Sequence, residues 1–317
     1  MKLTRRDLGK LAAAVIPMMG GTQALRAQTV LPRPELFNAV RAQGGAAKPN
    51  SKVAGVQLGM NVPYNFGGRD MNPDEMLDRI LKLNVSAIEM RSQPVENFLG
   101  SPAANGQKAE AEVMRKWRES VAMDRVAAFR KKFEDAGVLI DIVKYDGIYT
   151  MSDAEVNYCF ALARTLGARA ISCEIDAKHT ERIGQFAEKQ KLPVAYHGHA
   201  ATTPEHLETA FKQNRYNWAN LDIGHFVAGN NTSPVPFLRQ HHARIPHIHV
   251  KDRKMKEGAT TPFGEGDTPI VEVLRLIRDN KWPIQATIEF EYPVPAGSDR
   301  MAELAKTLEY CRRALAS

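Results

Sequence analysis

The sequence contains the segment Ile245-Pro246-His247-Ile248-His249-Val250-Lys251-Asp252, a short apolar run with polar side chains at alternate positions. A period of two is typical of a β-strand, because successive side chains point to opposite faces of the sheet. Apolar runs of similar length recur on both sides of this segment. The eight predicted strands are Val53–Gly59, Ala87–Arg91, Val138–Tyr145, Ala170–Ile175, Pro193–His199, Trp218–His225, Ile245–Asp252 and Pro283–Glu291.

Amphipathic stretches separate these runs and predict helices, several with a capping residue such as Ser152 at the start. Eight alternating pairs over residues 53–317 predict an α/β fold, a single (β/α)8 TIM barrel domain. A doubly wound sheet is the alternative, but Gly59-Met60-Asn61-Val62-Pro63 is not the phosphate loop that such a sheet would carry. The predicted helices are Asp74–Leu83, Ala111–Ala136, Asp153–Leu166, Thr180–Gln190, Pro204–Lys212, Pro236–His242, Ile270–Asn280 and Asp299–Leu315.

The N-terminal residues have the pattern of an export signal. Arg5-Arg6 precede the apolar run Leu11–Met19 and a small-residue cleavage site. The run is too short to span a bilayer, and the arginine pair resembles the twin-arginine signal that exports folded proteins. A generic secretory signal or an uncleaved anchor is the alternative. We predict a signal over residues 1–27, a linker over residues 28–52, and a periplasmic barrel with no stable membrane span.

The composition does not indicate a nucleic-acid partner. The formal net charge is +7, of which residues 1–27 carry +4, so the remainder carries +3. A charge this small gives no basis for expecting a basic face. The three cysteines include no CxxC pair, which argues against a disulfide framework or a cysteine-rich zinc site.

Five consecutive predicted strands end in acidic or imidazole side chains. In a TIM barrel such positions converge on the functional face. Any one of them alone fits a buried structural group equally well, so the prediction of a metal site depends on their recurrence. Mixed oxygen and nitrogen ligands suit Mn²⁺, Co²⁺, Zn²⁺ or Fe²⁺, with Mg²⁺ as a further candidate, and suit Ca²⁺ poorly. The residues are Glu174, His197, His199, Asp222, His225, His247, His249, Glu289 and Glu291.

Four motifs carry a resemblance to a known family: Leu221-Asp222-Ile223-Gly224-His225, His247-Ile248-His249, Gly264-Glu265-Gly266 and Ile288-Glu289. From about Val53 onward the chain resembles the xylose isomerase-like TIM barrels, which include sugar epimerases, inosose isomerases and dehydratases and, more distantly, endonuclease IV. The resemblance implies that Asp222, His249 and Glu289 are metal ligands, with His225 nearby at the substrate. It also implies a small-molecule carbohydrate substrate and allows a homo-oligomer.

The fifth strand departs from the family pattern. Many of the epimerases end this strand in a Glu that binds the metal and removes a proton, whereas this chain has Tyr196-His197-Gly198-His199. The fourth ligand is then Glu174 or His197, and we predict Glu174 because it restores the balance of carboxylates around the ion that the resemblance implies. His197 and His199 become candidate bases, counted as catalytic together with Glu289 and His225.

Further charged residues end other predicted strands. Lys144 and Lys251 are predicted to steady an anionic oxygen of the substrate, although each is equally compatible with a solvated position. Glu291 is predicted to contact the substrate as well. Glu89 and Arg91 end the second strand, and their roles stay open.

The predicted reaction is isomerisation or epimerisation of an unphosphorylated carbohydrate, with proton abstraction next to a carbonyl and a metal-stabilised enediolate. The alternative is a lyase or dehydratase that eliminates a β-substituent from a keto-sugar or 3-keto-glycoside. A non-catalytic sugar-binding or partner subunit is a third interpretation. A phosphodiesterase like endonuclease IV is disfavoured, because no histidine precedes His179.

Overall fold

The computed structural model describes residues 48–317 of the chain. The predicted export signal and most of the predicted linker therefore lie outside the described residues. The described part begins against the barrel, where Ser51 is buried and its hydroxyl donates to the carbonyl of Leu58 at 2.7 Å. Within the described part, no helix combines the length and apolar character that a membrane crossing requires.

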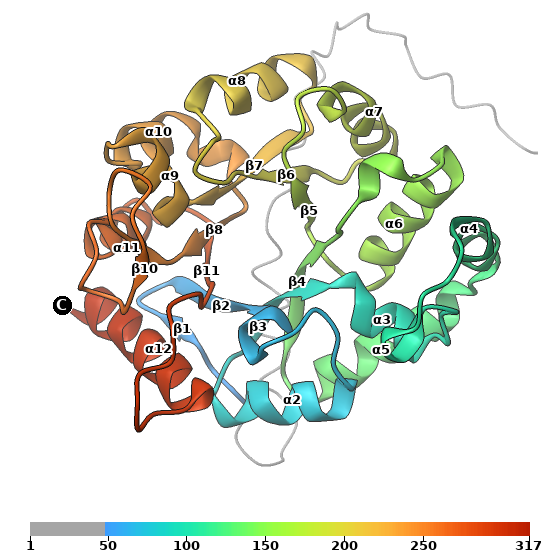
Figure 1. Ribbon diagram of the computed structural model, residues 1–317, viewed down its shortest axis with the longest axis horizontal. Coiled ribbons are helices and arrows are strands. Elements are labelled where there is room, and N and C mark those ends of the chain that lie inside the picture. The colour runs from blue at the N-terminus through green and yellow to red at the C-terminus, as the bar shows by residue number, and fades with distance from the viewer. Residues whose placement is uncertain (1–47) are drawn as a thin grey trace, which may run out of the picture. The chain divides into compact units, whose positions relative to one another are not determined.

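Eight parallel strands close into a barrel around the centre of the molecule (Figure 1). Each strand pairs with its neighbours in chain order, and the last pairs with the first. This closure confirms the predicted TIM barrel. The strands are β2 Val56–Val62, β3 Ala87–Arg91, β4 Leu139–Lys144, β5 Ala170–Glu174, β6 Val194–His197, β7 Asn217–Asp222, β8 His247–Val250 and β11 Gln285–Ile288.

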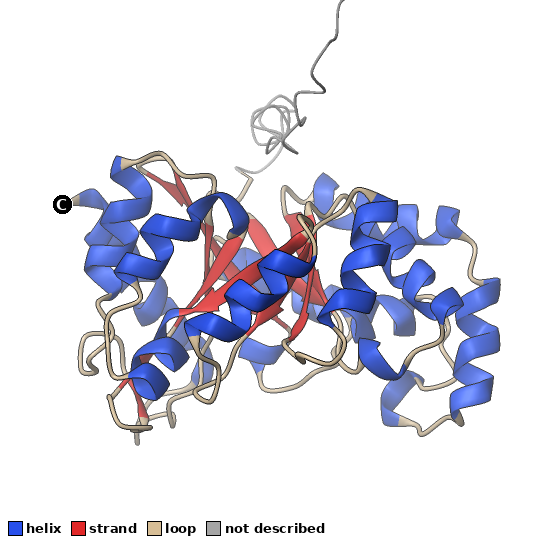
Figure 2. Cartoon of the chain, turned by 90° about the horizontal axis from the view of Figure 1, so that it is seen from above, coloured by secondary structure: helices blue, strands red, loops and turns tan. Residues whose placement is uncertain are grey.

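Helices surround the strands and cover their outer faces, as both views show (Figure 1, Figure 2). Every residue of β2 and of β3 is buried, as expected for parallel strands packed on both faces. The helices are α2 Pro73–Lys82, α3 Ser92–Phe98, α4 Ala111–Ser120, α5 Met123–Asp135, α6 Asp153–Thr165, α7 Thr180–Gln190, α8 Pro204–Gln213, α9 Ile223–Asn230, α10 Val235–His241, α11 Ile270–Asp279 and α12 Arg300–Ala316.

Short elements complete the described chain. β1 pairs antiparallel with β2, and β9 pairs antiparallel with β10. These elements and the single-turn 3₁₀ helices are β1 Lys52–Val53, β9 Asp252–Arg253, β10 Thr260–Thr261, η2 Tyr64–Phe66, η3 Ala104–Gly106, η4 Ile148–Thr150 and η5 His242–Arg244.

The predicted strand Trp218–His225 is too long at its carboxyl end. The strand stops at Asp222, whose side chain accepts a hydrogen bond from the backbone N–H of His225 at 2.8 Å. This bond satisfies one of the free donors at the start of helix α9, so Asp222 acts as the N-cap of α9. His225 therefore lies in the first turn of a helix that the sequence pattern did not predict.

The predicted helix Ala111–Ala136 is two helices, α4 and α5. Val121 and the following residue have extended backbone angles and separate them. The break lets Arg118 of α4 pair with Glu96 of α3 and Glu155 of α6, each at 2.9 Å. Helix α3 was not predicted either.

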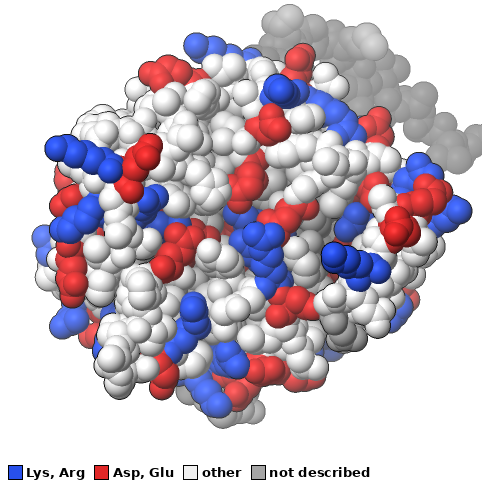
Figure 3. All heavy atoms as spheres, in the orientation of Figure 1, with Lys and Arg blue, Asp and Glu red and all other residues white. Residues whose placement is uncertain are grey.

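Acidic and basic side chains are interspersed over the molecular face shown in Figure 3. This distribution agrees with the small net charge expected for the folded part of the chain.

Candidate metal centre

Four side chains from the carboxyl ends of four consecutive strands converge inside the barrel mouth. His197 ends β6, Asp222 ends β7, His249 lies on β8 and Glu289 follows β11. One ligand atom from each lies within 4.8 Å of the others. His197 Nε2 is 3.3 Å from Asp222 Oδ2, and His249 Nδ1 is 3.1 Å from Glu289 Oε2. All four side chains are buried.

The spacing of these atoms fits one divalent ion. Ligand atoms held about 2.1 Å from a single ion lie roughly 3–4 Å apart. Two further separations, His197 Nε2 to Glu289 Oε2 at 4.0 Å and His249 Nδ1 to Asp222 Oδ2 at 3.8 Å, fall in this range. His249 Nδ1 and Glu289 Oε2 are buried without a well-directed hydrogen bond, although Lys251 Nζ lies 2.8 Å from the carboxylate oxygen as an ion-pair partner.

Buried charge makes the same group attractive to a cation. Burial alone would disfavour ionised carboxylates, but His225 and Lys251 hold the pKa of Asp222 well below its usual range. For Glu289, His249 and Lys251 outweigh burial and likewise lower the pKa. Both carboxylates are therefore ionised at neutral pH and available as ligands.

Lys251 lies directly beside the group. Its Nζ is 2.8 Å from Glu289 Oε2, 3.1 Å from Asp222 Oδ2 and 2.7 Å from Glu291 Oε2. Burial opposes its charge, but these carboxylates raise the pKa of Lys251 above the ordinary value. The ammonium is therefore positioned to stabilise negative charge at the mouth of the barrel.

Glu174, the predicted fourth ligand, lies outside the four-residue group. Its Oε2 is 2.8 Å from both His197 Nδ1 and His199 Nε2, and its Oε1 is 2.8 Å from Lys144 Nζ. In the four-residue group the fourth side chain is therefore His197, while Glu174 forms a second candidate group with His197 and His199. Glu174 and His197 are register partners on β5 and β6, and the Glu174 carboxylate contacts the Nδ1 side of the imidazole, whereas Nε2 faces Asp222.

His199 and His225 face each other at the mouth, with ring centroids 4.8 Å apart. His199 is 60% exposed, and its contact with Glu174 raises its pKa. Burial lowers the pKa of His225 to about 4, although Asp222 opposes this shift. His225 Nε2 lies 3.0 Å from Lys251 Nζ.

Glu89, whose role was open in the sequence, and His247 lie beneath the centre. Glu89 of β3 is fully buried, with Oε2 2.5 Å from His249 Nε2. His247 lies 3.6 Å from Glu89 Oε1, and burial lowers its pKa to about 4. The sequence could have indicated a role for Glu89, because Glu89 is a charged residue within a strand, β3, whose residues are all buried.

Two polar side chains near Glu289 and Glu291 were missed altogether. Asn61 on β2 donates to Glu289 Oε1 at 2.8 Å, and Tyr64 in η2 donates to Glu291 Oε1 at 2.9 Å. Both follow the predicted first strand Val53–Gly59, at a point where the sequence shows no charged residue. Burial and the neighbouring Glu291 raise the pKa of Tyr64 to about 12, so it remains a donor at neutral pH.

The remaining strand-end residues are already paired. Arg91 binds both oxygens of Asp146, at 2.9 and 2.7 Å. The loop Gly264-Glu265-Gly266 folds around Asp252, whose Oδ2 accepts from the amides of Gly264 and Gly266 at 2.8 and 3.0 Å. These two amides therefore stabilise the loop.

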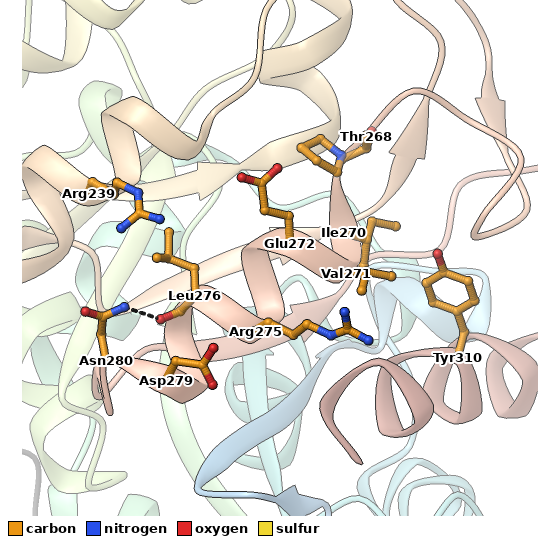
Figure 4. Close-up of a pocket in the computed structure, with 11 residues that line it drawn as sticks. Arg239, Thr268, Ile270, Val271, Glu272, Arg275, Leu276, Asp279, Asn280 and Tyr310 are labelled. Atoms are coloured by element: carbon orange, nitrogen blue, oxygen red, sulfur yellow. Dashed lines mark hydrogen bonds between the residues drawn. The ribbon is translucent and has the colours of Figure 1, made fainter. Parts of the chain in front are cut away.

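A surface groove of about 620 Å³ lies away from this centre, on the outer helix layer. Figure 4 shows its lining, which comes mainly from α11, with Arg239 of α10 and Tyr310 of α12 at its edges. None of the predicted site residues lines it.

Comparison with known proteins gives related sequences over part of the chain. The inosose dehydratase of Clostridium tetani (strain Massachusetts / E88) is 27% identical over 156 residues, which cover 42% of this chain and 52% of that protein. The inosose dehydratase of Clostridium botulinum (strain Eklund 17B / Type B) is 26% identical over 133 residues, covering 35% and 44%. The chain thus spans about half the length of the curated relatives it matches.

Solved structures share the fold over most of the barrel. A xylose isomerase domain protein from Alicyclobacillus acidocaldarius has a TM-score of 0.61 at 14% identity, covering 83% of this chain and all of that one. The probable 3-DHS dehydratase of petrobactin synthesis from Bacillus anthracis has a TM-score of 0.59 at 13% identity, covering 80% and 98%. Residues 160–314 match the family described as xylose isomerase-like TIM barrel. Together with the closed eight-stranded barrel, this match shows that the chain is similar to the xylose isomerase-like TIM barrels, the family that its motifs resemble.

Proposed function

We propose that the protein is a divalent-metal-dependent carbon–oxygen lyase that acts on an unphosphorylated keto-sugar. The observation that carries the proposal is the buried group of His197, Asp222, His249 and Glu289 beside the exposed His199, whose imidazole contacts Glu174. Relatives named inosose dehydratase support elimination over the isomerisation predicted from the sequence.

The residues present suit proton transfer on one side of a substrate. Many of the epimerases that the chain resembles have a proton-abstracting Glu at the end of the fifth strand, where this chain has His197. Because His197 Nε2 faces Asp222 and Glu289, it is a candidate ligand, and the exposed His199 is left as the base. A single base is sufficient for elimination or isomerisation, whereas epimerisation needs proton delivery from the opposite face.

Three parts of the site contribute to elimination: the metal-binding group, Lys251 and His199. A bound divalent ion, held by His197, Asp222, His249 and Glu289, would supply Lewis-acid polarisation of the substrate carbonyl. Lys251 stabilises the negative charge that develops on the carbonyl oxygen. Glu174 holds the His199 ring through Nε2, so Nδ1 is the atom that exchanges a proton with the substrate.

His199 acts twice in this scheme. Its Nδ1 takes the proton from the carbon next to the carbonyl, and the C–H electron pair moves toward the carbonyl oxygen to give an enolate. The enolate then expels the β-oxygen, its electron pair forms a carbon–carbon double bond, and the leaving oxygen takes the proton back from His199. The substrate thus loses water when the oxygen on the β-carbon is a hydroxyl, or an alcohol when that oxygen is glycosidic, and His199 is regenerated.

The charges at the mouth favour a neutral substrate. Lys144, Lys251 and Arg91 all contact carboxylates, at 2.8 Å from Glu174, 2.7 Å from Glu291 and 2.7 Å from Asp146, respectively. A phosphate would have to compete with these carboxylates for the cations. The proposed export of the protein to the periplasm, motivated by residues 1–27, points to the same substrate class.

Isomerisation is the second candidate, because it shares the first step. The proton on His199 would return to the neighbouring carbon instead of the leaving oxygen. The one-sided base and the description of the matching family support this candidate.

Product analysis distinguishes the two reactions. Metal-loaded protein, with Mn²⁺ or Co²⁺, is assayed on a panel of ketoses and 3-keto-glycosides. Elimination releases water or an alcohol and gives an unsaturated ketone that absorbs in the ultraviolet, whereas an isomer of the substrate would support the second candidate. Glu289→Gln is expected to abolish turnover with the fold intact by circular dichroism, while the exposed Glu272→Gln on α11 retains it. Absence of turnover on the whole panel by metal-loaded protein would overturn the proposal.

A further inference from the structure

Both histidines of the candidate metal centre have a carboxylate at the nitrogen that faces away from the centre. His197 directs Nε2 toward Asp222 Oδ2 at 3.3 Å, and its Nδ1 is 2.8 Å from Glu174 Oε2. His249 directs Nδ1 toward Glu289 Oε2 at 3.1 Å, and its Nε2 is 2.5 Å from Glu89 Oε2. The same arrangement thus occurs twice, with the two ring nitrogens in exchanged roles.

A neutral imidazole has one N–H and one lone pair. An ionised carboxylate only accepts hydrogen bonds, so the nitrogen beside it carries the proton and the other nitrogen is left as the ligand atom. Partners of this kind fix the tautomer and the ring orientation of metal-binding histidines. We propose that Glu174 and Glu89 are positioning residues that prepare His197 to bind a metal ion through Nε2 and His249 to bind it through Nδ1.

The inference rests on the proposed metal centre and assigns new roles to its two outer carboxylates. The contacts of Glu174 explain why it is not itself a ligand. Its Oε2 accepts from His197 and His199, and its Oε1 lies 2.8 Å from the buried Lys144. Both oxygens are thus engaged by side chains on the far side of His197 from the centre.

Glu89 reaches His249 from the opposite side of the barrel. It is fully buried, as is His249, so no solvent weakens the contact between them. The Asn220 side-chain amide lies 3.0 Å from the same Nε2, and a protonated Nε2 requires the amide oxygen, which otherwise has no hydrogen-bond partner, on that side. Glu89→Gln therefore replaces an acceptor-only group by an amide that can also donate, so the His249 tautomer is no longer fixed while the four candidate ligands remain in place.

A second buried group of side chains offers an alternative to the proposed role of Glu89. Glu89, His247 and His249 could together bind another ion, since one ligand atom from each lies within 4.8 Å of the others. Such an ion would take the place of the proton on His249 Nε2. The two arrangements differ in the number of ions bound and in the protonation of that nitrogen.

The first test is a long-range ¹H–¹⁵N spectrum of the full chain labelled with ¹⁵N-histidine and loaded with Zn²⁺. We expect a proton on Nδ1 of His197 and on Nε2 of His249, with the other nitrogen of each ring shifted by the metal, and one ion per chain. Two ions per chain, or the opposite tautomers, would overturn the inference.

The second test measures Zn²⁺ affinity by competition with a chromophoric chelator. Glu89→Gln and Glu174→Gln are each expected to weaken binding by about 10- to 100-fold, the usual effect of losing such a partner. The matched control is Glu208→Gln, which removes a carboxylate 3.2 Å from His241 in the outer helix layer and should leave the affinity unchanged. Wild-type affinity in both site variants would contradict the proposal.

Two further readouts separate positioning from simple loss of structure and from failure of the proposed reaction. The visible spectrum of the Co²⁺-loaded protein reports ligand geometry, and we expect it to change in both site variants. If Glu89→Gln does not fold, the tautomers of the wild-type chain decide the question alone. Because no readout depends on turnover, a protein that binds Zn²⁺ as expected but converts no keto-sugar would refute the proposed function and leave this inference standing.

Discussion

Asp222 uses its two carboxylate oxygens for different purposes. Oδ1 accepts the backbone N–H of His225 and begins helix α9, while Oδ2 faces His197 and His249 in the candidate metal centre. The spacing of Asp222 and His225 in the sequence thus has a structural cause, because a helix cap accepts from a residue in the first turn. The same spacing places the His225 ring beside Lys251.

The first prediction concerns His199. If it transfers the proton, His199→Asn lowers kcat by about 10²- to 10⁴-fold, the usual contribution of a general base, with a small effect on metal content. The control is His206→Asn, which changes an exposed imidazole on α8 and should leave kcat unchanged. Steady-state kinetics on the best keto-sugar measure both variants, and equal rates would remove His199 from the mechanism.

The second prediction concerns the pH dependence of the same residue. The hydrogen bond with Glu174 raises the pKa of His199 above its ordinary value of 6.5. A base must be neutral to accept a proton, so kcat/KM should rise with increasing pH through an apparent pKa above 6.5. The rising limb should disappear in His199→Asn. A limb centred below 6.5 in the wild-type protein would contradict this role.

Helix α9 lies unusually close to the strand that carries the candidate ligand His249. A methyl group added at Gly224 would come within 2.8 Å of the carbonyl oxygen of Lys251 and would also meet the Lys251 side chain. Only glycine allows this approach, which brings His225 and Lys251 together at the mouth.

The third prediction follows from this packing. Gly224→Ala should lower the free energy of unfolding by about 1–3 kcal/mol, the cost of overpacking, and should weaken metal binding by displacing Lys251 and His225. Urea denaturation and metal titration measure the two effects. Gly68→Ala serves as control, because its added methyl group would approach no heavy atom closer than 3.3 Å. A variant of Gly224 as stable as the control would show that the approach is not tight.

At the scale of the whole barrel, Arg169 joins strands at the amino end. Its guanidinium binds Asp141 of β4 at 2.8 Å and donates to the carbonyls of Pro246 and Pro283, which precede β8 and β11. One side chain thus connects segments far apart in the sequence. This end of a TIM barrel serves stability, whereas the opposite end serves function.

The fourth prediction tests whether the amino end of the barrel affects stability without affecting metal binding at the carboxyl end. Arg169→Ala should lower the free energy of unfolding by about 1–3 kcal/mol, because it leaves Asp141 and two carbonyl groups without their partner. Metal affinity should stay unchanged, since the candidate ligands lie at the carboxyl ends of the strands. Adding Asp141→Asn should recover part of the lost stability. A large loss of metal affinity in Arg169→Ala would contradict this division.

The fifth prediction concerns removal of the metal. An ion that binds only the folded chain stabilises it by about 2.7 kcal/mol at a hundredfold excess over its Kd, which corresponds to roughly 5–10 °C in Tm for a domain of this size. Chelation should therefore lower the Tm and abolish turnover, and Mn²⁺ or Co²⁺ should restore both. Asp222→Asn should show no metal-dependent change in Tm.

The sequence alone determined the barrel and the edge at which its acidic and imidazole side chains meet. Alternating strands and helices require parallel strands, whose carboxyl ends share one rim, so the order of the chain is enough to assign Asp222, His249 and Glu289 to one place. Only the tertiary structure decided that His197 rather than Glu174 lies with them, and that Glu89 lies behind His249. Strand periodicity gives the face on which a side chain lies, whereas its depth and its partners depend on side chains from strands distant in the sequence.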